Sequence, residues 1–186
     1  MSNLVMPAEP HDGRERSELS LTFEDYWRRL RGDRDAPVRP NVSPRSIPAA
    51  MLPGMFIVSI GIADTVGTSE IRLAGTRFRQ IMNTEVTGIK LAQLVADTER
   101  EKFQPLRNAI LERLCGVWLT GELPLQEVKQ IYTAAYTFFP LKSHAEGPVD
   151  YVIGLMECDV PLTLRGSSSL LFSKILQFRL IETHVL

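Results

Sequence analysis

The spacing of apolar and polar residues first predicts a short helix. The apolar positions that repeat at helical spacing are Phe23, Tyr26, Trp27 and Leu30. Thr22 is a suitable N-cap and Gly32 a suitable stop. Residues 1–21, which are rich in Pro, Gly, Ser and charge, predict a mobile arm before the helix. Five prolines between positions 37 and 53 exclude a continuous helix or central strand, so residues 22–55 should hold the helix and a proline-rich strap.

Alternation with period two predicts strands from residue 56 onward. Residues 56–62 and 70–74 form a predicted hairpin, with Ile71 and Leu73 on the same face. Short helices are expected over residues 76–90, and a longer one should begin at a capping box of Thr98 and Glu101 and end at Gly116. Three more strands are predicted over residues 117–119, 127–141 and 151–158, with a turn at 143–148.

The order of these elements predicts the fold class. Two strands, a helical middle and three strands favour an α+β fold with an antiparallel sheet, whose core spans residues 56–159. The C-terminal extension, residues 160–186, is apolar to its end, and its spacing is compatible with a helix face at Leu170, Leu171, Ile175, Leu176 and Phe178 without deciding its structure. Such a segment should dock either on its own domain or on a second copy of the chain.

Composition and charge exclude several classes of protein. The chain has 186 residues, of which 44% are hydrophobic and 23% charged, as expected of one soluble globular domain with an appendage. A net charge of −1 gives no field that would attract nucleic acid. Two cysteines are too few for a disulfide framework, and no apolar run is long enough for a membrane span. We therefore expect a cytoplasmic protein that binds no nucleic acid and does not span a membrane.

Several short motifs, taken in order, resemble a bacterial family of small PAS-type proteins. The most recognisable is the run from Arg72 to Thr76, RLAGT, and Pro140-Leu141 is similar to the end of the family's long strand. The resemblance covers roughly residues 23–158. The motif residues are Tyr26, Trp27, Leu30, Arg31, Gly32, Arg72, Leu73, Ala74, Gly75, Thr76, Thr87 and Gly88.

The resemblance implies a PAS-like fold: a five-stranded antiparallel sheet with helices on one face, here with an N-terminal helix and an apolar C-terminal tail in addition. In some members of this family the fold encloses a cavity that holds a ligand. The candidate lining residues in this chain are Leu73, Phe78, Phe103, Leu106, Ile110, Tyr136 and Met156. Family members commonly associate, so a homodimer is expected.

The sequence disfavours haem and flavin and leaves the cofactor unknown. Haem needs an axial ligand, usually histidine, and His11, His144 and His184 all lie outside the helical middle. Photosensory flavin chemistry needs a reactive cysteine after the second strand, where this chain has residues 75–80, GTRFRQ. No metal-ligating pattern occurs. Cys115 and Cys158 are better explained as buried inert thiols than as nucleophiles.

Three other features have both a functional and a structural interpretation. Arg72 is able to bind a carboxylate or phosphate, but its place on a strand favours a structural role. Tyr26 and Trp27 offer an interaction hot spot or a packing face, and packing is favoured. The arginines between positions 28 and 39 alternate with acidic residues, which favours a self-paired surface over an anion site.

The leading hypothesis is a stand-alone sensory or signalling module that acts by binding an unidentified signalling protein, with possible regulation by a ligand. The alternative is a small-molecule binding protein whose cavity is itself the function. No common catalytic signature occurs, so the chain is not expected to be an enzyme, although an enzyme with an unrecognised site is a third hypothesis. In the leading hypothesis, residues 76–114 shift relative to the sheet, and the N-terminal helix or the tail reports the change.

Overall fold

The computed structural model describes residues 15–60, 66–161 and 168–183. These residues form an open six-stranded sheet in the order β2-β1-β5-β4-β3-β6, in which all neighbours are antiparallel. The strands are β1 (Met55–Ser59), β2 (Glu70–Ala74), β3 (Gly116–Leu125), β4 (Gln130–Lys142), β5 (Val149–Cys158) and β6 (Lys174–Ile181). The helices are α1 (Glu18–Arg31), α2 (Thr76–Met82) and α3 (Asp97–Glu112), with short 3-10 turns η1 (Arg39–Asn41), η2 (Leu52–Gly54), η3 (Val66–Thr68) and η4 (Leu91–Gln93). The predicted α+β class with an antiparallel sheet is confirmed.

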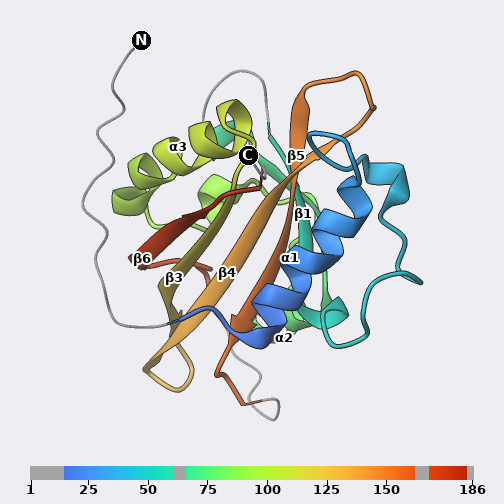
Figure 1. The fold of residues 1–186 in the computed structure, drawn as a ribbon. Coiled ribbons are helices and arrows are strands. Elements are labelled where there is room, and N and C mark those ends of the chain that lie inside the picture. The colour runs from blue at the N-terminus through green and yellow to red at the C-terminus, as the bar shows by residue number, and fades with distance from the viewer. Residues whose placement is uncertain (1–14, 61–65, 162–167, 184–186) are drawn as a thin grey trace.

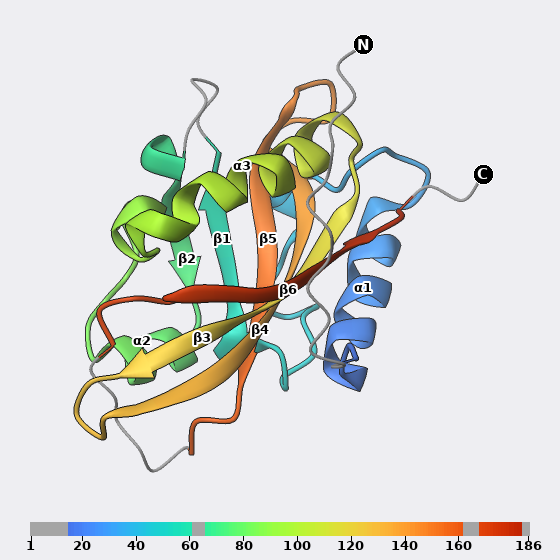
Figure 2. The ribbon, with the colours of Figure 1, turned by 90° about the vertical axis from the view of Figure 1, so that its left-hand side faces the viewer.

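The sheet has a buried layer on each face. Helices α2 and α3 cover one face, which we call the inner face, and α1 covers the other, which we call the outer face (Figures 1 and 2). Alternate residues of each strand divide between the two layers, because successive side chains of a strand point to opposite faces. On β3, for example, Val117 and Leu119 belong to the inner layer and Trp118 to the outer one.

Helix α1 begins five residues earlier than its predicted N-cap, Thr22, suggested. Its N-cap is Ser17, whose Oγ accepts a hydrogen bond from the Ser20 amide at 3.0 Å, so residues 18–21 are helical rather than part of an arm. Residues 1–14 of the predicted arm lie outside the described residues. Phe23 and Trp27 are fully buried against the Phe139 ring, with centroid distances of 5.6 and 4.9 Å. The packing interpretation of this helix is confirmed.

The proline-rich strap contains only short turns among its described residues, as its prolines predict. It is fixed to the end of β4, where the Lys142 amide donates to the Pro37 carbonyl at 3.0 Å. The Lys142 ammonium also bonds the Asp35 carboxylate at 2.7 Å. Two apolar residues of the strap, Ala36 and Met51, are fully buried.

The C-terminal extension contributes a strand, β6, where a helix face is one interpretation of its apolar spacing. β6 pairs with β3, so this segment docks on its own domain, one of the two possibilities left open. The register shifts between Thr120 and Gly121 of β3, which leaves Leu176 of β6 as an extra residue. Ile175 and Phe178 therefore both reach the inner layer, although they lie three residues apart.

Several boundaries differ from the predicted ones. β1 ends at Ser59, and residues 61–65 of the predicted first strand and turn lie outside the described residues. β3 continues through Pro124 to Leu125, well past the predicted end at Leu119, and β4 begins at Gln130. α3 begins at Asp97 and ends at Glu112, and no side-chain hydrogen bond caps its start, so the predicted capping box does not form.

Candidate functional site

A small apolar cavity lies between α3 and the inner face of the sheet. Its volume is about 60 Å³. Ten of its twelve lining residues are apolar, which suits an uncharged ligand, and the two polar ones are Ser69 and Arg107. The lining residues are Val58, Ile60, Ser69, Leu91, Phe103, Leu106, Arg107, Ile110, Val117, Leu119, Phe138 and Val152.

Helical and strand periodicity place these side chains. Phe103, Leu106 and Ile110 lie three and four residues apart on α3 and so share its buried stripe. Val117 and Leu119 are alternate residues of β3 and point to the same face. A ligand in this cavity would thus touch both the helix and the sheet, and its binding would depend on how closely they pack.

Aromatic rings fill the other end of the inner layer. Phe172, from the segment before β6, packs against Tyr136 and Phe103 with centroid distances of 4.1 and 5.2 Å. The buried Tyr136 hydroxyl donates to the Leu171 carbonyl at 3.0 Å, and burial raises the pKa of this phenol well above its ordinary value. Only about 10 Å³ of space remains among these rings, so this end is packed shut.

Six of the seven candidate lining residues, all except Leu73, belong to the inner layer. Phe103, Leu106 and Ile110 line the larger cavity. Phe78, Phe103 and Tyr136 line the smaller space. Met156 is buried in the same layer but lines neither space.

Leu73 is a correction, because its side chain is 42% exposed and lines no cavity. The register between β1 and β2 shifts between Ile57 and Val58, so Ile71 pairs with Val58 and Leu73 pairs with Ile57. Paired residues share a face. Leu73 therefore follows Ile57 to the outer face, whereas Ile71 points inward. The uniform alternation predicted for this strand missed the bulge.

The lining residues on the strands, the loop and turn residues Ile60, Ser69 and Leu91, and one residue on the helix were not predicted. Arg107 follows Phe103 by four positions and precedes Ile110 by three, so helical spacing alone places it on the same stripe. Val152 and Phe138 come from β5 and β4, and their place depends on sheet register, which had no signal in the sequence.

The motif residues between Tyr26 and Gly32 attach α1 to the outer face. The Trp27 indole Nε1 donates to the Pro140 carbonyl at 2.8 Å, so two parts of the family resemblance that lie far apart in sequence are in contact. Tyr26 is buried beside it, Leu30 is half-buried, and Gly32 ends the helix with a φ of 58°. These residues position the helix and contact no cavity on the inner face.

The RLAGT residues make the junction between β2 and α2. Arg72 forms an ion pair with Glu70, which supports its structural interpretation. Gly75 has an ordinary φ of −70°, but a Cβ there would lie 2.3 Å from the carbonyl oxygens of both Leu52 and Pro53. The position therefore requires glycine because two backbone segments approach it closely, while Ala74 and Thr76 end the strand and start the helix.

Thr87 and Gly88 shape the turn that follows α2. The Gly88 amide donates to the Ile71 carbonyl at 2.7 Å, with a φ of 88° at the glycine. The Thr87 hydroxyl donates to Glu85 Oε1 at 2.8 Å, and bonds from the Thr87 amide and hydroxyl hold the pKa of this carboxyl below its ordinary value. Thr87 and Gly88 thus attach the loop that follows α2 to strand β2.

The candidate thiols and histidines do not meet in the described structure. Cys115 is buried, its thiol donates to the Ala109 carbonyl at 3.3 Å, and burial raises its pKa. Cys158 is half-buried at the end of β5. His144 is exposed in the turn after β4, and His11 and His184 lie outside the described residues. No group of His, Cys, Asp and Glu within residues 15–60, 66–161 and 168–183 has a metal-binding arrangement.

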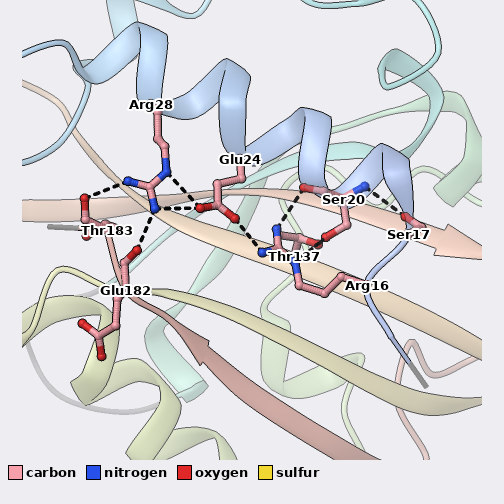
Figure 3. A network of polar contacts seen from close by, with 8 residues as sticks. All are labelled: Arg16, Ser17, Ser20, Glu24, Arg28, Thr137, Glu182 and Thr183. Carbon is pink, nitrogen blue, oxygen red and sulfur yellow. Dashed lines mark hydrogen bonds and ion pairs between the residues drawn. The ribbon is translucent and has the colours of Figure 1, made fainter. Parts of the chain in front are cut away.

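A network of arginines joins α1 to the end of β6 (Figure 3). Arg28 donates to the carbonyl oxygens of Thr183 at 3.0 Å and Glu182 at 2.7 Å, while its other bonds go to Glu24. Arg31 also donates to the Thr183 carbonyl, at 2.6 Å. Arg28 and Arg31 thus bind within the molecule, as a self-paired surface requires, although two of their acceptors are backbone carbonyls.

The other side of β6 is tied to α3. The Ile175 amide donates to the buried Glu99 carboxylate at 2.8 Å, and Lys102 Nζ donates to the same carboxylate. Burial opposes the charged form of Glu99, but these bonds outweigh it and hold its pKa below the ordinary value. β6 is therefore bonded both to the helix that covers the cavity and to the helix on the outer face.

The match to a family model decides the family. The model of a PAS domain matches residues 15–157, from just before α1 to the end of β5. The chain belongs to the PAS family. This PAS domain has β6 as an additional strand beyond the matched residues. Its family is one of sensory and signalling modules, and no curated protein matches the sequence. None of the helices that the structure describes is long and apolar enough to cross a membrane.

Proposed function

We propose that this PAS domain is a cytoplasmic sensory module that binds a small apolar molecule in the cavity under α3 and signals by binding a partner protein. The observation that carries the proposal is the apolar cavity, whose walls include α3 on one side and β1, β3, β4 and β5 on the other. Transfer of an apolar ligand from water into this cavity is favoured in free energy by the hydrophobic effect. Its size is limited, because the cavity measures about 60 Å³.

The route from the cavity to the surface is a chain of hydrogen bonds. Phe103 and Leu106 of α3 line the cavity, and Glu99 of the same helix holds the Ile175 amide of β6. The end of β6 is in turn held by Arg28 and Arg31 of α1. A shift of α3 on ligand binding changes the balance between two packings of β6 and α1, which present the result to a partner.

The cavity is tested by native mass spectrometry of the full chain purified from its source cells. We expect an additional mass that disappears on denaturation, and its loss in Ile110→Trp, whose larger side chain fills the cavity. Ile89→Trp is the matched control, because Ile89 packs against the inner layer without lining the cavity. A bound mass that persists in Ile110→Trp would contradict this location.

The signalling step is tested by hydrogen exchange. Xenon is a suitable probe, because apolar cavities in proteins bind it and a single atom is small enough for a cavity of about 60 Å³. Xenon should change the exchange of the β6 amides and of α1 in the wild type but not in Ile110→Trp. Binding without any change in β6 or α1 would favour the alternative function, a small-molecule binding protein whose cavity is sealed by the tail.

Two further parts of the proposal concern assembly and chemistry. A homodimer is proposed, and light scattering that shows a monomer at high concentration would contradict it. We also propose that the chain is not an enzyme, a view supported by the burial that raises the pKa of the Cys115 thiol. Labelling of Cys115 in the native protein should be slower than that of a free cysteine.

A further inference from the structure

A second hollow lies on the outer face of the sheet, away from the cavity under α3. Its volume is about 130 Å³, and it lies beside the start of α1. The residues that line it are Glu15, Ser17, Trp118, Thr120, Thr133, Ala135, Glu157, Cys158 and Asp159. None of these residues lines the apolar cavity, so the hollow is a separate feature of the molecule.

The sheet register explains why a hollow forms here. Thr120 on β3, Ala135 on β4 and Glu157 on β5 are cross-strand partners and so share the outer face in one row. Ala135, in the middle, has only a methyl group, while larger polar side chains stand on both sides. Since strands lie about 4.8 Å apart, the outer two backbones are about 10 Å apart, and the gap over Ala135 between their side chains spans about 4–6 Å.

Two of the residues that line this hollow carry a buried polar group with no hydrogen-bond partner. Trp118 and Thr120 are each 1% exposed, and neither the indole Nε1 nor the hydroxyl Oγ1 makes a bond in the structure. Leaving a buried polar group unpaired costs about 1–3 kcal/mol, so buried groups are normally satisfied. The indole nitrogen only donates, whereas the hydroxyl donates or accepts. Together they require an oxygen acceptor.

The opposite wall of the hollow is acidic. Glu157 accepts a hydrogen bond from Ser17 Oγ at 2.6 Å, and Glu15 and Asp159 lie on the same rim. Burial raises the pKa of Glu157, which a positive group nearby would reverse. Of the two neighbouring arginines, Arg16 pairs with Glu24 at 2.5 Å, and its charge only partly offsets the raised pKa of Glu157, while the Arg179 guanidinium lies 5.7 Å from the Trp118 ring centroid.

We propose that this hollow binds a small primary ammonium compound that also carries a hydroxyl or carbonyl oxygen, an amino alcohol or amino amide. Its ammonium group lies against Glu157, and its oxygen accepts from Trp118 and pairs with Thr120. The width of the gap over Ala135, given the strand spacing of about 4.8 Å, suits a compound in which about two or three bonds separate the nitrogen from the oxygen. The acidic residues that line the hollow lack the arrangement of a metal site, which favours an organic cation over a metal ion.

The test uses the full chain labelled with ¹⁵N and follows its two indole N–H signals. Ethanolamine and glycinamide, which carry both groups, are the probes. Propylamine carries the charge without the oxygen, and propionamide carries the oxygen without the charge. We expect the Trp118 signal to move with either probe while the Trp27 signal, which reports the bond to Pro140, stays in place. Each single-group compound should bind at least about tenfold more weakly, the effect of about 1.4 kcal/mol.

Three variants locate the binding groups. Thr120→Val keeps the shape of the side chain without its hydroxyl, and Glu157→Gln removes the charge; each should weaken ethanolamine binding about tenfold. Glu146→Gln, at an exposed position in the turn after β4, is the control and should bind as the wild type does. An unchanged Trp27 signal shows in each case that α1 remains docked.

Two results would overturn the proposal. No movement of the Trp118 signal at millimolar concentrations of either probe would mean that water alone satisfies the hollow. Equal binding by propylamine, or by the Thr120→Val and Glu157→Gln variants, would mean that the cation binds elsewhere on the acidic surface.

Discussion

The two tryptophans of the chain offer a direct measurement of the bond that attaches α1 to the sheet. Trp27 and Trp118 are 0% and 1% exposed on the same outer face. Each ring carries an arginine guanidinium, at 5.5 Å for Arg31 over Trp27 and 5.7 Å for Arg179 over Trp118. They differ in their hydrogen bonds: the Trp27 indole donates to the Pro140 carbonyl at 2.8 Å, and the Trp118 indole has no partner.

Replacing each by phenylalanine removes the same volume from the same core. Trp27→Phe also leaves the Pro140 carbonyl without its indole donor, and the register between β3 and β4 ends at the Val117–Phe138 pair, before Pro140. An unsatisfied buried acceptor costs about 1–3 kcal/mol. Trp118→Phe loses no hydrogen bond. We therefore expect Trp27→Phe to be less stable than Trp118→Phe by about 1–3 kcal/mol, or by about 2–12 °C in Tm for a chain of this size.

Urea unfolding followed by far-ultraviolet circular dichroism suits this comparison, because it does not depend on tryptophan fluorescence. The slope of the free energy with urea should be the same for both variants, so that the midpoints alone report the difference. Equal losses of stability in the two variants would refute the reasoning, since the indole bond to Pro140 would then contribute nothing measurable.

Two further predictions concern close packing and a buried carboxylate. Gly75→Ala should lose about 1–3 kcal/mol in urea unfolding, because its Cβ would meet two backbone oxygens at 2.3 Å, whereas Gly147→Ala, with its nearest contact at 3.5 Å, should change stability by less than about 0.5 kcal/mol; similar values for both would contradict the close approach. The pKa of Glu99 is lowered, so its charged form stabilises the fold above the ordinary value of 4.5, and this stability is lost as the pH falls through the folded pKa. Glu99→Gln should thus be less stable than the wild type at pH 7, with a gap that narrows at lower pH, while the exposed control Glu101→Gln should show a constant difference from the wild type.

The sequence was most informative where a single rule decides local structure. Apolar spacing at Phe23, Tyr26 and Trp27 correctly predicted both the helix and its packing on the sheet. The order of strands and helices correctly predicted an α+β fold with an antiparallel sheet. The α3 side of the cavity was also predictable, because Phe103, Leu106 and Ile110 lie on one stripe.

The two bulges account for the main errors. In β2 the shifted register sends Leu73 to the outer face, although it is two residues from the buried Ile71. In β6 the extra residue Leu176 puts Ile175 and Phe178 on one face at a spacing of three, which imitates a helix. A bulge depends on pairing with another strand, and no local pattern in one sequence contains that information.

The predicted helix caps were wrong for a different reason. Thr98 and Glu101 have the spacing of a capping box, and Thr22 precedes an apolar run, yet α3 begins at Asp97 and α1 is capped by Ser17. A capping pattern identifies residues that are able to accept a hydrogen bond from a free helix amide. Tertiary contacts decide which of these residues caps the helix. The outer hollow was unpredictable for the same reason as the bulges, because it arises from three residues aligned across β3, β4 and β5.

The bonds between α1 and β6 also set an order of events during synthesis. Arg28 and the Thr183 carbonyl that it binds are 155 positions apart. At about 5–20 residues per second, the ribosome makes the acceptor about 8–31 s after the arginine. The Pro140 carbonyl, 113 positions after Trp27, comes earlier, so the helix can dock on β4 before β6 exists. The N-terminal helix is thus held first by its tryptophan, and it acquires its arginine bonds only when the last strand is complete.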